Sequence, residues 1–395
     1  MILNFQTTPA DPTDYLPNPP KSKSQATTSM GEIATILDFI DSCGYTFEPW
    51  QVATFVTALR TKPFLILAGI SGTGKTHLPR LVAHATGAEA IIVPVKPDWT
   101  DSSDLLGYER LDGGFTPGTL LKVADLAISR PETQFFFVLD EMNIARVEYY
   151  FAEVLSVLES RTRSSSGEII SAPLNPASSG HAPFSGLNWE EVYLPQNISL
   201  IGTVNMDETT HGFSKKVLDR SFVLEMSDVD LMNFPSQRGK NSPPPLTLGS
   251  DYWHQRFLTL SELGDPSSYP AVVSAVNTLV RANQALQEAQ LQVGYRVRDE
   301  IALFCVNAEP HLDFFVDTEE SVISPEDLGL MMKVLPRISG GGPIVESIVE
   351  DLIEWTDSST FGVDTELMAD FPRSHKKLSF MKRRLDSTGY TSYWI

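Results

Sequence analysis

Cysteine and basic residues are scarce in this chain of 395 residues, and each scarcity excludes a class of protein. The two cysteines, Cys43 and Cys305, have no metal-ligand spacing, so we expect reduced, buried thiols in a cytoplasmic protein. Lys and Arg number 30 against 50 Asp and Glu, which gives a net charge of −20. This charge disfavours a stand-alone DNA binder, because phosphate contacts need concentrated Lys and Arg.

Long apolar runs are also missing. No stretch approaches the roughly 18 apolar residues of a membrane helix, and residues 1–6 lack the basic and apolar regions of a signal peptide. We therefore expect no membrane contact. The sequence contains no Glu-x-Lys, so the usual acid-and-lysine nuclease core is absent. The one clearly basic stretch, His375 to Arg384, is interpreted as the solvated face of a terminal helix.

A phosphate-binding loop is the most informative feature that is present. Apolar Phe64 to Leu67 predicts a short buried strand, and the residues that follow it match G-x-x-x-x-G-K-[ST]. Glycines let backbone N–H groups face phosphate oxygens, and a lysine neutralises the β- and γ-phosphates. The residues expected to bind the nucleotide are Gly69, Ser71, Gly72, Thr73, Gly74, Lys75 and Thr76. His77 to Ala85 predicts the helix whose N-terminus faces the same phosphates.

The surrounding pattern predicts an α/β domain. Three more apolar strands are expected at Ile91 to Val95, Phe135 to Leu139 and Ile198 to Val204, with helical patterns between them, one of them at Ile144 to Arg161. This alternation favours a parallel sheet covered on both faces. Two segments interrupt it: Leu105 to Gly118 contains a hairpin-turn signal, and Ser164 to Gln196 is a long segment rich in Ser, Pro and Gly.

We divide the chain into three parts. Residues 1–29 are rich in Pro, Ser, Thr and Asp and are expected to be disordered. Residues 30–245 form the α/β nucleotide-binding core, which ends at a Pro-rich linker. Residues 246–395 form a helical region, in which Ser324 caps a helix that has Pro325 at its first position, and Gly389 ends the last helix.

Polar residues follow the third and fourth strands, where ligands bind in such sheets. Asp140 is expected to hold Mg²⁺, as is the Thr76 hydroxyl, and Glu141 to orient or deprotonate the attacking water. Asn205 ends the fourth strand and can sense the γ-phosphate, although it could equally cap the next turn. Two arginines beyond that strand are candidate site residues: Arg220, which can reach a neighbouring copy's nucleotide from a subunit edge, and Arg296, which begins a helix in the second region.

In this order, the motifs resemble those of the AAA+ ATPases, whose fold is a three-layer αβα core followed by a helical lid. Within that family the two insertions resemble the dynein-related and MoxR-like branch. The motor subunits of McrB type, from modification-dependent restriction systems, are the most similar group. The residues behind this resemblance are 68–76, Asp140-Glu141-Met142-Asn143, residues 202–207, Lys216 to Arg220 and Gly294 to Val297.

The resemblance implies several roles and partners. Lys75, Thr76, Asp140, Glu141, Asn205 and the lid arginine Arg296 would act on the nucleotide bound to the same chain. Arg220 would act in trans in a ring, which in this family is hexameric, with ATP or GTP and Mg²⁺ between protomers. A separate, McrC-like nuclease subunit would dock on the ring, and DNA would be contacted through partners or the pore.

The chain also departs from the GTP-using relatives. They carry Asn-x-x-Asp-Arg at the fourth strand, where this chain has Glu208 and Thr209 in the last two positions. This difference slightly favours ATP. The N-terminal region is too short and too irregular to be the family's reader of modified bases, so we expect either a fragment or a motor that relies on partners for target recognition. Two alternatives stay open: a MoxR-like chaperone acting on a protein client, and a nucleotide-bound scaffold that does not hydrolyse.

Overall fold

The computed structural model describes residues 29–206, 211–229, 231, 245–317, 320–357 and 371–394. The segment 1–29, expected to be disordered, lies outside these residues except for Ser29, where the first helix begins. Most of the Pro-rich linker before residue 245 also lies outside them, as do Glu208 and Thr209.

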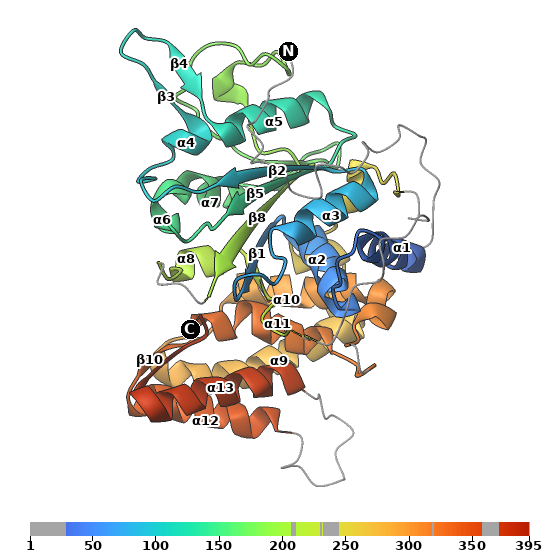
Figure 1. The fold of residues 1–395 in the computed structure, drawn as a ribbon, viewed down its shortest axis with the longest axis vertical. Helices are drawn as coiled ribbons and strands as arrows, with labels where there is room; N and C mark the ends of the chain where they lie inside the picture. The colour runs from blue at the N-terminus through green and yellow to red at the C-terminus, as the bar shows by residue number, and fades with distance from the viewer. Residues whose placement is uncertain are drawn as a thin grey trace.

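A five-stranded parallel sheet forms the centre of the first region (Figure 1). Its strands, in the spatial order β2-β5-β8-β1-β9, are β2 (Glu89–Pro94), β5 (Phe135–Asp140), β8 (Ile198–Asn205), β1 (Phe64–Gly69) and β9 (Phe222–Glu225). Four of the five strands are almost entirely buried, as near-continuous apolar runs require when helices cover both faces of a sheet. Because every pair is parallel, the carboxyl ends meet at one edge, where Gly69 lies opposite Asn205.

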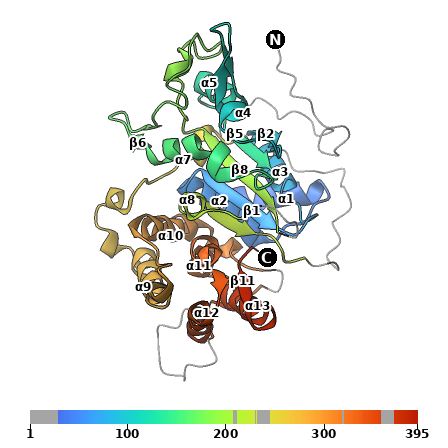
Figure 2. The same ribbon diagram turned by 90° about the vertical axis from the view of Figure 1, so that its left-hand side faces the viewer.

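Helices flank this sheet on both sides. In Figure 2, α7 lies on one side of the sheet and α3 on the other, which confirms the expected αβα layering. The helices of this region are α1 (Ser29–Ser42), α2 (Pro49–Thr61), α3 (His77–Thr86), α4 (Ser103–Leu106), α5 (Thr119–Ser129), α6 (Val147–Tyr150), α7 (Ala152–Glu159) and α8 (Lys215–Leu218).

One expectation about these elements is wrong, and one strand was not foreseen. The single helix expected over Ile144 to Arg161 is two helices, α6 and α7, separated at Phe151. Tyr150 and Phe151 are adjacent and both fully buried, whereas adjacent side chains on a straight helix point about 100° apart. The fifth strand, β9, was not expected, because its apolar run of Phe222 to Leu224 is too short to be distinguished by pattern alone.

The two insertions leave the sheet as separate β-structures. Residues 107–109 (β3) and 115–117 (β4) pair antiparallel, which confirms the hairpin expected in Leu105 to Gly118. Residues 162–163 (β6) and 169–170 (β7) pair likewise, and the chain then runs to Gln196 with only one short 3₁₀ helix, Trp189–Glu191.

The second region is mainly helical, as expected. It contains α9 (Pro270–Leu286), α10 (Tyr295–Ala308), α11 (Pro325–Lys333), α12 (Pro343–Thr356) and α13 (Pro372–Thr388), with one small antiparallel pair, β10 (Ser339–Gly341) and β11 (Tyr390–Ser392). The Ser324 hydroxyl accepts from the Asp327 N–H at the start of α11, and Gly389 ends α13 with φ 75°, so both predicted helix signals are confirmed.

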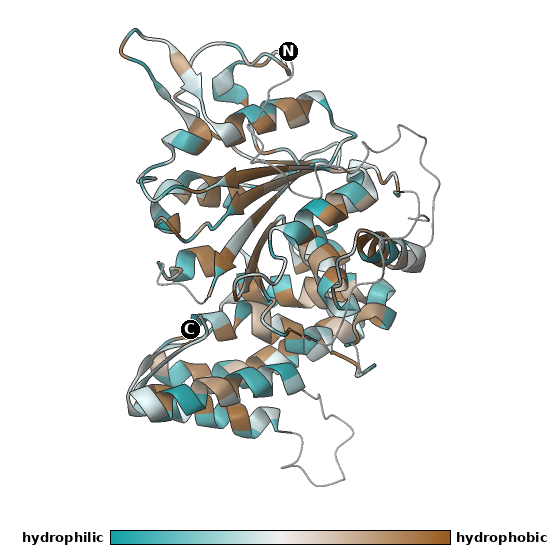
Figure 3. Ribbon diagram, viewed as in Figure 1, coloured by the Kyte–Doolittle hydropathy of each residue, from teal (hydrophilic) through white to brown (hydrophobic). Residues whose placement is uncertain are grey.

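Hydropathy follows this arrangement. Figure 3 shows an apolar sheet between helices whose outward faces are polar, and the buried side chains of both regions join in one core. Among the described residues, no helix combines the length and apolar character that a membrane span requires.

Candidate functional site

The phosphate-binding loop connects β1 to α3, as predicted. Gly69 and Gly74 have φ of 158° and 86°, values that other residues rarely adopt. A Cβ on Gly69 would lie 2.8 Å from the Met226 carbonyl oxygen, and one on Gly74 would lie 2.9 Å from the Phe47 ring. The glycines therefore serve both the backbone turn and the close packing of the loop against neighbouring segments.

Lys75 is buried in this loop, with 6% of its surface exposed. Its Nζ donates to the carbonyl oxygens of Gly69, at 3.0 Å, and Ile70, at 2.6 Å. The Thr73 hydroxyl also donates to the Ile70 carbonyl, and Ser71 and Gly72 form the exposed tip. The Lys75 ammonium therefore lies within the loop whose backbone N–H groups would surround a phosphate.

One carboxylate oxygen connects the end of β5 to β8 and to the start of α3. The hydroxyls of Thr76 and Thr203 both donate to Oδ1 of Asp140, each at 2.7 Å. Thr203 lies on β8 and also accepts from the backbone N–H of Glu141 at 3.0 Å. This threonine therefore orients both acidic residues. The sequence contained it two positions before Asn205 but no motif assigned it a role.

Glu141 and Asn205 are brought together, as expected. The Asn205 amide donates to Oε1 of Glu141 at 3.2 Å. Glu141 has φ 54°, in the left-handed region, which costs a residue with a side chain of the order of 1–3 kcal/mol. The turn directs the Glu141 carboxylate to the strand tip that carries Asn205.

The donor set at this edge suits Mg²⁺. Magnesium prefers hard oxygen ligands and is usually held by one or two protein groups together with substrate phosphates. The hydroxyl of Thr76 and the carboxylate of Asp140 are such ligands and lie in contact beside the loop. The residues present therefore fit the ion that the sequence motifs imply.

Arg220 and Arg296 meet on a shared acidic residue instead of joining this cluster. Glu159 ends α7, and its Oε2 lies 2.7 Å from Nη2 of Arg220 while its Oε1 pairs with Arg296, in the first turn of α10. Burial tends to raise the pKa of Glu159, but hydrogen bonds and charge from the two arginines hold it below its ordinary value. Arg296, expected over the phosphates of its own chain, is therefore placed beside the residue expected to act in trans.

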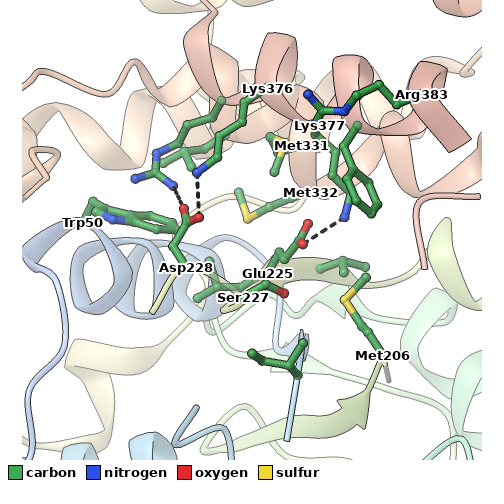
Figure 4. A pocket seen from close by; sticks show the side chains of 16 residues that line it. Trp50, Met206, Glu225, Ser227, Asp228, Met331, Met332, Lys376, Lys377 and Arg383 are labelled. Atoms are coloured by element: carbon green, nitrogen blue, oxygen red, sulfur yellow. Dashed lines mark hydrogen bonds and ion pairs between the residues drawn. The ribbon is translucent and has the colours of Figure 1, made fainter. Parts of the chain in front are cut away.

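A cavity of about 530 Å³ separates the sheet from the helical region, beside the phosphate-binding loop. Its lining includes Ile70 of the loop, Trp50 of α2, and Met331 and Met332 of α11. Figure 4 labels Trp50 and the two methionines around the cavity. This volume is in the range of pockets that bury small ligands, and its mainly apolar walls suit a flat ring system.

Charged pairs border the same cavity. Lys376 and Arg373 of α13 pair with Asp228 at 2.8 and 3.1 Å, and Lys377 pairs with Glu225 at 2.8 Å (Figure 4). The interpretation of the basic stretch as a solvated face is therefore wrong for Lys377, whose side chain is 10% exposed, but it holds for Lys376, whose side chain is 74% exposed. Glu225 ends the unforeseen strand β9 and Asp228 follows it, so no sequence pattern indicated the pairing.

Comparisons with known proteins agree with this geometry. Residues 64–222 match a family model described as an AAA domain of the dynein-related subfamily, and residues 250–390 match a domain of unknown function. The chain is 26% identical over 268 residues to the Type IV methyl-directed restriction enzyme EcoKMcrB subunit of Escherichia coli strain K12. That alignment covers 65% of this chain and 50% of the relative, so the chain spans about half the relative's length.

Among solved structures, the chain is similar to a protein of Cytophaga hutchinsonii described as a candidate ATPase. The TM-score is 0.46 at 13% identity, over 78% of this chain and 87% of that one.

Proposed function

The chain is an AAA+ ATPase of the McrB and MoxR type, and from that premise we propose that it hydrolyses ATP or GTP at the edge formed by β1, β5 and β8. The observation that carries the proposal is the connected set Thr76, Asp140, Thr203, Glu141 and Asn205 beside the buried ammonium of Lys75.

Each residue has a role in this reaction. Lys75 and the loop amides bind the β- and γ-phosphates, and Glu141 takes a proton from the attacking water. The amide of Asn205 donates to the Glu141 carboxylate and would hold it in place for the attacking water. Thr76 and Asp140 would hold Mg²⁺, which supplies charge neutralisation for the leaving phosphate. In this proposal residues 30–245 are the nucleotide-binding core and residues 246–395 the lid.

The cavity beside Ile70 is our proposed site for the base and sugar. It continues from the phosphate-binding loop and lies between core and lid, so a bound nucleotide would contact both. We retain the slight preference for ATP, on the Glu208 and Thr209 differences alone.

A neighbouring copy would complete the site. A trans arginine stabilises the charge that develops on the transferred phosphoryl group. Arg220 has this role in our proposal, and Arg296 is held beside it by Glu159. This shared partner favours a trans position for Arg296 as well, in place of the cis role that the family resemblance implied.

We propose that the assembled protein is a cytoplasmic ring, hexameric in keeping with its family, that powers a DNA restriction or defence complex. The relative from Escherichia coli is itself a restriction enzyme subunit. Since the sequence has no Glu-x-Lys, DNA cutting would belong to a separate, McrC-like nuclease, with DNA reached through partners or the pore. A MoxR-like chaperone is the second candidate function, because the same nucleotide-hydrolysing domain can act on a protein client.

The decisive experiment measures hydrolysis of ATP and GTP side by side for the full chain with Mg²⁺. We expect turnover of at least one of them and its loss in Lys75→Ala, while the surface variant Lys122→Ala keeps the wild-type rate. Stimulation by a nuclease partner would favour the restriction motor, and stimulation by a protein client the chaperone. Nucleotide binding without any turnover, alone or with partners, would instead support the scaffold and refute the proposed reaction.

A further inference from the structure

Lys333, the last residue of α11, is a buried lysine that the proposed reaction does not use. Only 1% of its surface is exposed. Its ammonium donates to the backbone carbonyl oxygens of Leu218 and Asp219, both at 3.2 Å, and of Ser221, at 2.7 Å. These three residues surround Arg220 in the chain. A lysine of the helical region therefore hydrogen-bonds to the backbone on both sides of the proposed trans arginine, Arg220.

Acidic and basic neighbours complete this contact. Oε2 of Glu300, on α10, lies 2.6 Å from Nζ of Lys333, and Oε1 of Glu300 pairs with Lys62 before β1. Burial alone would raise the pKa of Glu300, but the charges of Lys333 and Lys62 hold it below its ordinary value. The carboxylate is therefore ionised and balances the buried ammonium, as a stable buried ion cluster requires.

A second basic residue of the helical region, Arg337, forms an ion pair with the side chain of Asp219, which precedes Arg220. The Arg337 guanidinium pairs with the Asp219 carboxylate, and its Nε donates to the Lys333 carbonyl oxygen at 3.1 Å. Arg220 itself has its guanidinium outside this cluster, on Glu159 and on the Lys216 carbonyl oxygen. The backbone on both sides of Arg220 thus contacts the helical region, while its side chain pairs with Glu159 of α7.

We infer that Lys333 is a positioning residue that holds Arg220 for action on the neighbouring copy's nucleotide. Leu328, Met331 and Met332 of the same helix line the cavity beside the phosphate-binding loop, so one helix joins the wall of that cavity to the backbone on both sides of Arg220. This inference rests on the proposed trans role of Arg220.

The test is complementation between protomers mixed before assembly. Lys333→Met replaces the ammonium by an apolar chain of similar length and leaves Glu300 paired with Lys62. We expect it to retain nucleotide binding and to lose most hydrolysis, approaching the loss of about 10³-fold or more that follows removal of a trans arginine. Its own catalytic groups remain intact, so a neighbour with a well-placed Arg220 should restore it.

Glu141→Gln protomers supply that neighbour, because they cannot activate water but present Arg220 normally. Mixing Lys333→Met with Glu141→Gln should recover up to about a quarter of the wild-type rate, the share of sites that random pairing completes in a head-to-tail ring. Mixing Lys333→Met with Arg220→Ala should recover nothing. The control Arg281→Met removes a lid ion pair with Asp351 and should leave hydrolysis unchanged.

The outcomes separate the two proposals. If Arg220→Ala is complemented by Glu141→Gln but Lys333→Met is not, the trans reaction holds and the positioning role is refuted. If Arg220→Ala is not complemented either, the trans role itself is wrong. Should Lys333→Met fail to bind nucleotide, Arg337→Met decides in its place: a partial loss restored by Glu141→Gln supports the inference, and a wild-type rate or an unrestored loss overturns it.

Discussion

At the residue scale, a single side chain, Thr203, orients the two acidic residues of the site, Asp140 and Glu141. Thr203 donates to Asp140 and accepts from the Glu141 N–H, so one hydroxyl on β8 sets both. Glu141 has the left-handed backbone that its neighbours must maintain. The strained turn and its hydrogen bonds leave the Glu141 carboxylate at the strand tip in contact with Asn205.

We predict that Glu141→Gln lowers hydrolysis by about 10²–10⁴-fold, the usual contribution of a general base. Nucleotide binding should persist, because the amide keeps the shape of the side chain and Lys75 is untouched. Single-turnover hydrolysis and equilibrium binding of the same nucleotide measure the two effects. Glu153→Gln, an exposed position on the nearby helix α7, is the matched control. A wild-type rate in Glu141→Gln would remove Glu141 from the mechanism.

At the scale of elements, α2 connects the core to the helical region. It packs against β1 and β9 on one side and against α10 on the other. At its C-terminal end, Arg60 lies over the Tyr252 ring and 3.4 Å from Nε2 of His311, a histidine with 1% of its surface exposed. Burial, together with the charges of Arg60 and Arg256, lowers the pKa of His311 to about 4.

This shift predicts acid sensitivity. The pKa of His311 is about 4 in the folded protein against 6.5 for the ordinary group, so between these values the unfolded chain binds more protons. The free energy of unfolding should therefore be fully retained above pH 6.5 and fall as the pH drops towards 4, by up to about 3 kcal/mol. Urea unfolding at several pH values measures the slope.

The variant His311→Gln should flatten part of that slope, because its amide does not titrate but can still accept from Arg60. His181→Gln, at an exposed position, should keep the wild-type slope. Equal slopes in all three proteins would mean that His311 does not contribute to acid unfolding.

At the scale of the whole molecule, the two expected arginines lie together, on Glu159, and not at the phosphate-binding loop. Neither Arg220 nor Arg296 therefore lies at the nucleotide site of its own chain. Hydrolysis should then depend on self-association, which would bring a neighbour's arginine to that site. The acidic net charge of −20 opposes association, so we expect it to strengthen with salt, which screens charge repulsion.

We predict that Glu141→Gln with Mg²⁺ and its preferred nucleotide forms assemblies of about six copies, in keeping with closed rings, and that wild-type turnover per chain rises with protein concentration. Sedimentation and hydrolysis measured over the same concentrations test this. Arg220→Ala should bind nucleotide but turn over about 10³–10⁵-fold more slowly. Arg130→Ala, which removes an exposed pair with Glu89, is the control. A turnover per chain independent of concentration in a monomeric protein would contradict this prediction.

The sequence alone determined the loop, the strand ends and the helix signals. Each rests on local chemistry: glycines where the backbone must turn, an ammonium after them, and polar residues directly after apolar strands. Because the strands are parallel, their carboxyl ends meet at one edge of the sheet. Lys75, Thr76, Asp140, Glu141 and Asn205 could therefore be grouped before their contacts were known.

The tertiary structure alone decided which distant side chains meet. Thr203 reaches Asp140 across 63 residues and Lys333 reaches Ser221 across 112, and no local pattern specifies such pairs. The shared Glu159 and the break at Phe151 likewise depend on how helices pack on the sheet. Periodicity indicates which face of an element is buried, but the partner on that face is chosen by the fold.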